Sequence, residues 1–341
     1  MLEGAAHYIG AGLWAALTFL FAAFEPFMLR RSPLYWPFLV STLVVAMLAW
    51  GLHSGAGWSS WRAFRRRHFG RALWWHSSAR ADYRYYLVNA VAFPLVVGPA
   101  LFTGTALAGI LREALEPLLG MPSASGAPGW AMKLAYTLVF FVAYDFGRFV
   151  AHCALHDVPV LWEFHKPHHS AEVLTPLTAF RAHPVELAVM AWGAAITTGI
   201  ATWGFQWLAG TGIGYYQFLE MHVLLWGFSL LGNLKHWQVW ISYGAVLNRW
   251  LISPAHHQLH HSAEARHFGA NRGFELAIWD RLHGTLIVPQ KEEAFRMGLG
   301  DGTDGCWHRV GRLYYWPLIQ AARRITGRTA TLEGAPVALR R

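Results

Sequence analysis

The sequence predicts an all-α protein, a polytopic bundle of membrane helices. Three observations support this fold class. The 341 residues are 55% hydrophobic and only 14% charged, whereas proteins on average have about 25% charged residues. The charged residues also avoid several long stretches of the chain. Finally, aromatic residues make up 15% of the sequence, which is typical of proteins anchored at membrane interfaces.

The charge-free stretches predict where the membrane helices lie. Asp, Glu, Lys and Arg are absent from Gly4–Phe24, Ser32–Trp61, Tyr85–Leu111 and Leu187–Leu219. About 20 mostly apolar residues are enough for one helix to cross the hydrocarbon core. We therefore expect spanning helices at about residues 5–27, 34–53 and 85–108. A coarse reading of the rest of the chain adds a spanning helix at 132–151 and a re-entrant or hairpin pair at 186–207 and 213–231. No basic stretch precedes the first run, so we expect a retained helix there and not a cleaved signal peptide.

The distribution of positive charge predicts the orientation. The loop Arg62–Arg71 carries five arginines and no acid, which by the positive-inside rule places it in the cytoplasm. The Gly-, Pro- and Ser-rich segment Gly120–Gly129 is then a loop on the opposite side. The net charge of +9 does not indicate nucleic-acid binding, because the basic runs flank apolar segments. Cys153 and Cys306 form no C-x-x-C pair, which excludes thiolate zinc, iron–sulfur and c-type haem sites.

Histidines gather in the second half of the chain, where 14 of the 19 lie between His152 and His283. His152 and His156 are four residues apart and share one helical face. Two H-x-x-H-H motifs follow, and their histidines are His165, His168, His169, His257, His260 and His261. Ser253 and Pro254 predict a helix start just before the last motif, whereas Pro167 predicts that the earlier helix begins inside its motif.

This residue set predicts a site for two metal ions. Neutral imidazole suits iron, copper, zinc and nickel, and one ion takes four to six ligands. Eight histidines in three motifs exceed the need of one ion. Magnesium and calcium are excluded as partners, because both prefer oxygen ligands. Each motif also lies beyond an apolar run, so we expect a histidine-rich di-metal cap on the cytoplasmic side of the helical bundle. A transporter, in contrast, would hold its metal ligands at the bilayer midplane.

Five strings, in this order, resemble the motifs of the fatty acid hydroxylase / sterol desaturase superfamily of membrane di-iron oxygenases. They are DFGR…HCALH at 145–156, LWEFHKPHHS at 161–170, AFRAHPVE at 179–186, SPAHHQLHHS at 253–262 and NRG…WDRLHGT at 271–285. The resemblance covers roughly residues 132–288 and leaves the first 130 residues without a motif. Two departures stand out: His236 follows Asn233, where the family often has a histidine before the Asn, and Gly269 stands where the family tends to have Asp.

The candidate site residues follow from the motifs and the resemblance together. The three motifs supply eight ligands, and His236 is the best additional one. His183 and His267 are candidates either as ligands or as neighbours that bond to ligands, whereas His256 should point away from the metal site because it adjoins His257 on a helix. Asp145, seven residues before His152, can accept the free N–H of a ligating imidazole. The other candidates for supporting contacts are Glu163, Asn271 and Asp280.

The resemblance implies a function that the residues alone leave open. It divides the chain into N-terminal membrane helices with the basic loop (1–131), a fatty acid hydroxylase-like membrane and di-iron domain (132–290) and a C-terminal cytoplasmic extension (291–341). It implies two iron ions, O2 as co-substrate, and a lipid whose unactivated C–H bond is hydroxylated. A desaturase or sterol methyl oxidase of the same superfamily is the nearest alternative, and a metal-binding or transport membrane protein is the second. The sequence contains no dinucleotide, flavin or haem motif, so we expect electrons from a partner such as a ferredoxin, or a cytochrome with its reductase.

Overall fold

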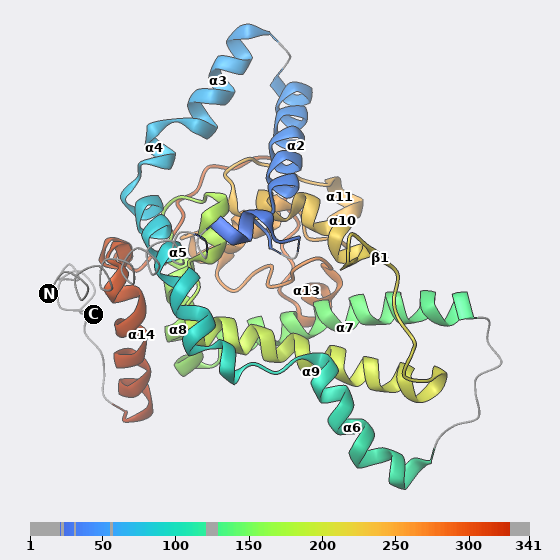
Figure 1. The fold of residues 1–341 in the computed structure, drawn as a ribbon. Helices are drawn as coiled ribbons and strands as arrows, with labels where there is room; N and C mark the ends of the chain where they lie inside the picture. Colours follow the sequence, from blue (N-terminus) through green and yellow to red (C-terminus); the bar gives the residue numbers. More distant parts are fainter. Residues whose placement is uncertain (1–20, 22–23, 31, 55–56, 121–128, 328–341) are drawn as a thin grey trace, which may run out of the picture.

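The computed structural model describes residues 21, 24–30, 32–54, 57–120 and 129–327. These residues form a helical protein, as the sequence predicts, with one two-stranded hairpin that it does not predict (Figure 1). The first half contains α2 (Trp36–Ser54), α3 (Trp58–Phe69), α4 (Arg71–Trp74), α5 (Ser77–Val96), η1 (Gly98–Ala100), α6 (Gly104–Leu119), α7 (Gly129–Asp157) and α8 (Pro159–His169). The second half contains η2 (Pro176–Phe180), α9 (Pro184–Ala209), β1 (Gln217–Phe218), β2 (Met221–His222), α10 (Val223–Gly232), η3 (Asn233–His236), α11 (Gly244–Leu247), α12 (Pro254–His260), η4 (Ala265–His267), α13 (Ile278–His283), η5 (Asp304–His308) and α14 (Val310–Ile325).

Helices α7 and α9 are the only two single helices, within the described ranges, that are long and apolar enough to cross a membrane. They lie side by side in Figure 1 and contact each other through glycines. A Cβ atom on Gly147 would lie 2.2 Å from the carbonyl oxygen of Gly193, and one on Gly193 would lie 2.5 Å from that of Gly147. Small residues of this kind let two membrane helices approach closely. The Thr197 hydroxyl reinforces the pair by donating to Ala143 O at 2.6 Å.

The predicted membrane segments are therefore correct in part. Segments 132–151 and 186–207 lie within α7 and α9, but α9 is long enough to span alone and is not half of a re-entrant pair. Segment 85–108 is not one helix, because the chain bends by 49° between Ser77–Leu95 and Gly98–Leu119, where Gly98 and Pro99 follow α5. These two helices form a third membrane span only if they cross the membrane together as one bent helix.

Two further predicted segments differ from the structure, and one falls largely outside it. The apolar part of α2, Trp36–Leu52, is shorter than the span predicted at 34–53. Segment 213–231 is not a membrane helix: it forms the β1–β2 hairpin and the ten-residue α10, because Leu219 and Glu220 adopt left-handed backbone angles and turn the chain. Of the first predicted segment, 5–27, only residues 21 and 24–27 are described.

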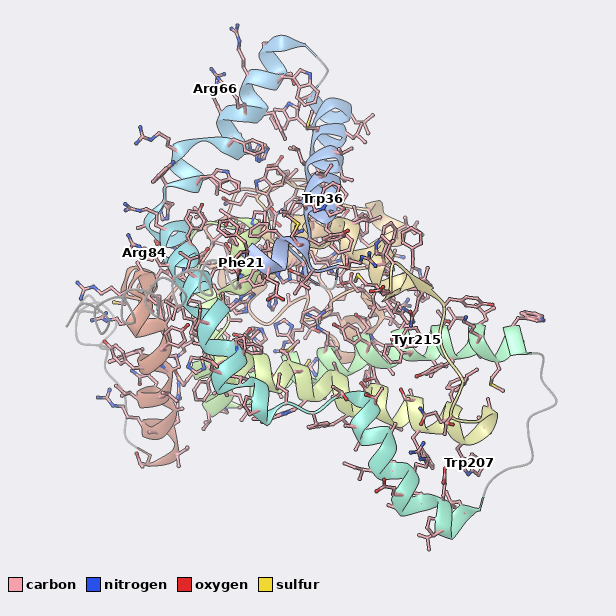
Figure 2. All side chains as sticks on the ribbon, in the orientation of Figure 1. Phe21, Trp36, Arg66, Arg84, Trp207 and Tyr215 are labelled. Atoms are coloured by element: carbon pink, nitrogen blue, oxygen red, sulfur yellow. The ribbon has the colours of Figure 1, made fainter. Side chains whose placement is uncertain are left out.

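The histidine motifs all lie at one end of the α7–α9 pair. Helix α7 ends at Asp157 and α8 begins two residues later, so the first two motifs are adjacent in space. The start of α5 lies at the same end, since Ser78 Oγ accepts a hydrogen bond from the amide of Glu172 at 3.2 Å. The arginines of α3 precede α5, and Figure 2 shows Arg66 among them pointing away from the helices. Basic surface and histidine motifs are therefore found toward the same end of the spanning pair.

Candidate metal centre

The first two histidine motifs are carried by consecutive helices. His152 and His156 lie on the last turns of α7. Helix α8 begins at Pro159, which has no N–H to leave unpaired at a helix start. It continues through Pro167 to His169, so the prediction that this helix begins at Pro167 is wrong, and His165 is helical rather than part of a turn.

The last motif lies on α12, which begins where the sequence predicts. Ser253 is the N-cap and Pro254 the first helical residue. The His256 imidazole turns back to this cap, with Nδ1 accepting from the Ser253 amide at 3.1 Å and lying 2.8 Å from its hydroxyl. His256 is thus occupied at the helix start and points away from the other histidines, whereas His257 and His260 face them.

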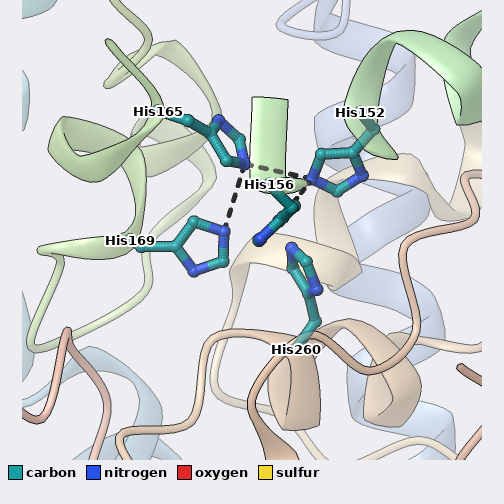
Figure 3. Close-up of side chains that lie close together, drawn as sticks. All are labelled: His152, His156, His165, His169 and His260. Carbon is teal, nitrogen blue, oxygen red and sulfur yellow. Dashed lines mark hydrogen bonds between the residues drawn. The ribbon is translucent and has the colours of Figure 1, made fainter. Parts of the chain in front are cut away.

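Nine histidines form two groups that can each hold a metal ion. Group one consists of His152, His156, His165, His169 and His260, and each of them offers one nitrogen within 4.8 Å of the others. Figure 3 shows the five rings directed toward one another. The Nε2 atom of His165 lies 3.1 Å from Nε2 of His152 and 3.1 Å from Nε2 of His169, and the Nε2 atoms of His152 and His156 are 3.2 Å apart.

Group two consists of His168, His236, His257 and His261. The Nε2 atom of His257 lies 3.0 Å from that of His236 and 3.2 Å from that of His261. His236 also approaches His168, at 3.4 Å between their Nε2 atoms. Residue 236 ends η3, which packs against α12, so the single histidine after Asn233 is brought to the last motif.

The two H-x-x-H-H motifs each serve both groups. The first and last histidines of α8, His165 and His169, belong to group one, and the middle one, His168, belongs to group two. In the motif at 257–261 the assignment is reversed: His257 and His261 belong to group two, and His260 belongs to group one. Residues four apart share a helical face, whereas the residue between them is rotated away. The groups therefore adjoin: the ring centroids of His169 in group one and His261 in group two are 4.8 Å apart, and those of His165 in group one and His168 in group two are 5.4 Å apart.

The nitrogen–nitrogen distances fit metal coordination. A metal–imidazole bond is about 2.0–2.1 Å, so two neighbouring nitrogens on one ion lie about 2.8–3.4 Å apart at octahedral or tetrahedral angles. The distances quoted for both groups fall in this interval. His260 Nε2 is buried in group one without a hydrogen-bond partner, as expected of a lone pair directed at an ion. Burial also lowers the pKa of His260 to about 4 and that of His168 to about 3, so both imidazoles are neutral ligands at pH 7.

Contacts on the outer side of the rings orient the group-one ligands. Nδ1 of His152 donates to the carbonyl oxygen of Arg272 at 2.7 Å, and Nδ1 of His260 donates to that of Ala270 at 2.7 Å. Both bonds place the ring proton on Nδ1 and leave Nε2 free to bind a metal. Nδ1 of His165 lies 3.0 Å from a carboxylate oxygen of Glu186, whose side chain is buried.

Asp280 and Asn271, two of the predicted supporting residues, act through the backbone. The Asp280 carboxylate accepts the amides of Arg272 and Gly273, each at 2.7 Å, and so fixes the peptide whose carbonyl bonds His152. The Asn271 side chain accepts from Ile287 N at 2.8 Å and donates to His256 O at 3.2 Å. Neither side chain touches a histidine ring of the two groups.

Asp145 and Glu163 do not have the contacts that we expect from the sequence. The Asp145 carboxylate accepts from the amides of Glu275 and Leu276 and from Trp279 Nε1, at 2.9–3.1 Å, and therefore does not bond His152. Seven residues of helix place it two turns below the imidazole, and the chain before α13 passes between them. Glu163 forms ion pairs with Lys166 and Arg324 at 2.7 and 2.9 Å.

The structure does not bring His183 or His267 into either group. His183 is the N-cap of α9, where Nδ1 accepts from Val185 N at 3.1 Å, and its Nε2 lies 3.1 Å from Tyr314 O. His267 Nδ1 lies 2.9 Å from the Ser262 hydroxyl. Both rings are therefore engaged with other partners.

Two features of the site that involve ionisable side chains were not among the site residues predicted from the sequence. Glu186 is one, although an acid that directly precedes the charge-free stretch 187–219 is a usable signal. The other is a buried ion pair in which Arg181 Nη1 lies 2.9 Å from Asp82 Oδ1, with both side chains fully buried. The same guanidinium donates to Pro167 O at 2.9 Å and to Ser170 Oγ at 3.0 Å. It thereby ties the motif on α8 to α5, a link that no local sequence pattern reveals.

A cavity of about 320 Å³ borders group one. Its lining includes His156, His169 and His260. Trp162, Phe268 and Leu299 provide apolar wall, and Arg272, which is ion-paired with Asp157 at 2.6 Å, provides the charged part. The cavity gives a molecule larger than water access to the group-one ligands.

Comparison with known proteins gives the same family as the motifs. The family model described as fatty acid hydroxylase matches residues 137–285. The chain is 30% identical over 158 residues to alkylglycerol monooxygenase of Xenopus tropicalis, covering 45% of this chain and 30% of that protein. It is 26% identical over 199 residues to an ornithine lipid hydroxylase of Rhizobium tropici, covering 58% of this chain and 55% of that protein.

A third relative belongs to the desaturase branch. A delta(7)-sterol 5(6)-desaturase of Gibberella zeae is 29% identical over 167 residues, covering 48% of this chain and 45% of that protein. The alignments thus span between 30% and 55% of the length of these three relatives. No solved structure matches the chain. All nine histidines of the two groups lie within residues 137–285, the segment that matches the fatty acid hydroxylase family.

Proposed function

We propose that this chain is a membrane di-iron oxygenase that hydroxylates an unactivated C–H bond of a lipid with O2 and electrons from a separate carrier. The observation that carries the proposal is the pair of adjoining all-imidazole groups with nitrogens 3.0–3.4 Å apart. Iron accepts imidazole ligands, whereas magnesium and calcium prefer oxygen. Two irons bound there would supply the activation of O2 that attack on such a C–H bond requires.

The side chains around the groups hold and shield the reacting region. The carbonyls of Ala270 and Arg272 take the Nδ1 protons of His260 and His152, so both rings keep one orientation. The buried Glu186 carboxyl lies 3.0 Å from Nδ1 of His165 and helps to hold the orientation of that ring. Trp162 and Phe268 line the cavity beside group one and offer apolar surface to the hydrocarbon part of a substrate.

The lipid substrate is inferred from the surroundings of the cavity and from the relatives. The cavity lies at the end of two apolar helices, so a lipid can reach it from the bilayer. The named relatives act on an alkylglycerol, an ornithine lipid and a sterol. A desaturase of the same superfamily is the nearest alternative, because loss of a second hydrogen in place of oxygen transfer depends on fine differences in substrate position.

Orientation and electron supply belong to the same proposal. The arginines of α3 precede α5, whose start contacts the loop after the second motif through Ser78 and Glu172. The positive-inside rule then gives a multi-pass protein with its metal centre on the cytoplasmic side. An acidic ferredoxin or cytochrome would be attracted to this basic surface, which raises its association rate.

A metal transporter or sensor is the alternative from a different class. Transport requires ligands near the bilayer midplane. Here His152 and His156 lie on the last turns of α7, and the other seven histidines of the two groups come from outside both candidate spans. This arrangement favours an enzyme at the membrane surface over a path through it.

The test combines metal analysis with lipid mass spectrometry. The protein is expressed with iron in excess, purified, and analysed for iron and zinc, and the lipids of cells with and without it are compared. We expect about two irons per chain and lipid species that gain one oxygen atom; species that lose two hydrogens would identify the desaturase instead. The double variant His168→Ala/His169→Ala should lose both iron and product, and His283→Ala, an exposed histidine outside the groups, should keep them. One zinc per chain with no iron would overturn the proposal.

A further inference from the structure

Helix α14 presents an apolar face to its surroundings. One side packs against α8 and neighbouring elements and buries Leu313, Pro317, Gln320 and Ala321. The opposite side leaves Tyr315, Leu318, Ile319 and Ile325 exposed by 47%, 54%, 38% and 72%. These positions recur at helical spacing, so they form one continuous stripe. A helix that faces water has polar residues at such positions, and this one does not.

Positive charge flanks the apolar stripe. The helix contains no acidic residue. The guanidinium of Arg312 lies 6.0 Å from the Trp316 ring centroid, and that of Arg323 lies 5.9 Å from the same ring, so both cations are held beside an aromatic side chain. An apolar stripe with arginines and Trp or Tyr at its borders matches the charge and polarity of an anionic lipid surface. The apolar stripe and its flanking arginines therefore favour a membrane surface as the binding partner of this face.

The position and direction of α14 agree with this occupant. The backbone oxygen of Tyr314 contacts His183, the N-cap of α9, and the Tyr314 hydroxyl bonds Asn89 at 2.7 Å. Because α9 begins at the end where the histidine motifs lie, α14 is at that end of the spanning pair. Figure 1 shows α14 running across the direction of α7 and α9, which is the direction of a helix lying in the membrane plane.

We propose that α14 is an interfacial helix that docks on an anionic lipid surface, with the stripe from Tyr315 to Ile325 at the boundary between headgroups and acyl chains. It fixes the depth of α8, and hence of the histidine motif on α8, relative to the bilayer. The inference requires neither metal binding nor oxygenase activity, so it can fail or hold independently of the proposed function.

The experiment measures the depth of the stripe with a spin label. Leu318→Cys is introduced into the full chain with Cys153→Ser and Cys306→Ser, labelled with a nitroxide and reconstituted in phosphatidylcholine vesicles with or without phosphatidylserine. We expect the label to collide more often with O2, which concentrates in the bilayer, than with a water-soluble nickel chelate. The matched control Lys291→Cys, an exposed position in the chain after the histidine motifs, should show the opposite preference.

Three results would overturn the proposal. The first is a Leu318→Cys label as accessible to the nickel chelate as the label at Lys291→Cys. The second is dipolar broadening between labels on two copies, which would assign the stripe to a homodimer. The third is a Leu318→Cys label that neither O2 nor the nickel chelate reaches, which would show that another part of a protein covers the stripe. A second variant separates charge from apolar contact: Arg312→Gln/Arg323→Gln should abolish any increase in O2 preference caused by phosphatidylserine and leave the value in phosphatidylcholine unchanged.

Discussion

The two histidine groups are built from the same motifs but have different surroundings. Group one takes two ligands from α7 and borders the 320 Å³ cavity through three of its histidines, whereas no group-two histidine lines that cavity. Group two is instead enclosed by α8, η3 and α12. A shared ligand pattern therefore does not make the two metal positions equivalent. We expect a substrate to meet group one, with group two behind it.

Removing one ligand from each group should give the largest effect. His260→Ala deletes a group-one ligand and His257→Ala deletes a group-two ligand. Each variant should lose at least about a hundredfold in activity, because both ions are needed, and should retain about one iron per chain, because the other group is intact. Metal analysis of the purified variants checks this. Loss of both irons in both variants would show that the groups do not bind independently.

Breaking the buried ion pair should instead affect both groups together. Asp82→Asn leaves the Arg181 cation buried without its partner, which costs about 3–5 kcal/mol. Arg181 holds Pro167 and Ser170, which flank two of the histidines that α8 supplies, so iron should be lost from both groups. Thermal unfolding in detergent and iron content measure the change. Glu113→Gln, at an exposed acid on α6, is the control; equal effects of the two substitutions would contradict the assigned role of Asp82.

Neutralising Glu186 should weaken group one alone. Its carboxylate lies 3.0 Å from Nδ1 of His165, and loss of such a partner typically lowers metal affinity about 10–100-fold. Chelator titration of Glu186→Gln should therefore show one weakened iron and one unchanged. Asp145→Asn provides a comparison, because that carboxylate bonds only backbone amides and Trp279 among the described residues. If both irons weaken equally in Glu186→Gln, the contact does not discriminate between the groups.

Changing the cavity wall should alter substrate binding without altering metal content. Phe268 lines the cavity and is itself 58% exposed, so Phe268→Ala widens the opening and removes apolar contact. We expect KM to rise severalfold with kcat nearly unchanged and both irons retained. Trp75→Ala, at an exposed aromatic residue outside the cavity, should leave KM unchanged. A fall in kcat without a change in KM would place the substrate elsewhere.

The smallest expected effect concerns the pH dependence of the metal-free protein. Burial lowers the pKa of His260 to about 4 and of His168 to about 3, against about 6.5 in the unfolded chain. Between these values the unfolded chain binds protons that the folded chain does not, so the free energy of unfolding falls as the pH drops below 6.5. At pH 5.5 the loss is on the order of 1 kcal/mol for each ring. Unfolding curves of chelator-treated protein at pH 7.5 and 5.5 measure it, and each alanine variant, His260→Ala or His168→Ala, should show a smaller decline.

Residue patterns alone predicted the helical membrane class and the nine histidines that approach one another, together with His183 and His267, which lie in neither group. A charge-free run identified α9, and a mostly apolar segment that carries three charged residues identified α7, because a helix in lipid must be largely apolar. The spacing of the motifs predicted shared helical faces, and the resemblance added the family. The apolar composition of residues 213–231 did not predict their structure correctly. The segment is apolar enough for a helix, but Leu219 and Glu220 adopt left-handed backbone angles and turn the chain into a hairpin.

The division of the histidines into two groups, and the contacts that support them, depend on how the helices pack. Spacing places His168 and His169 side by side, but their assignment to different groups depends on where η3 and α12 pack. The supporting contacts join distant residues, such as His152 with Arg272, 120 positions apart, and Arg181 with Asp82, 99 positions apart. A contact of this kind depends on the packing of whole helices, and so no local pattern of residues contains it.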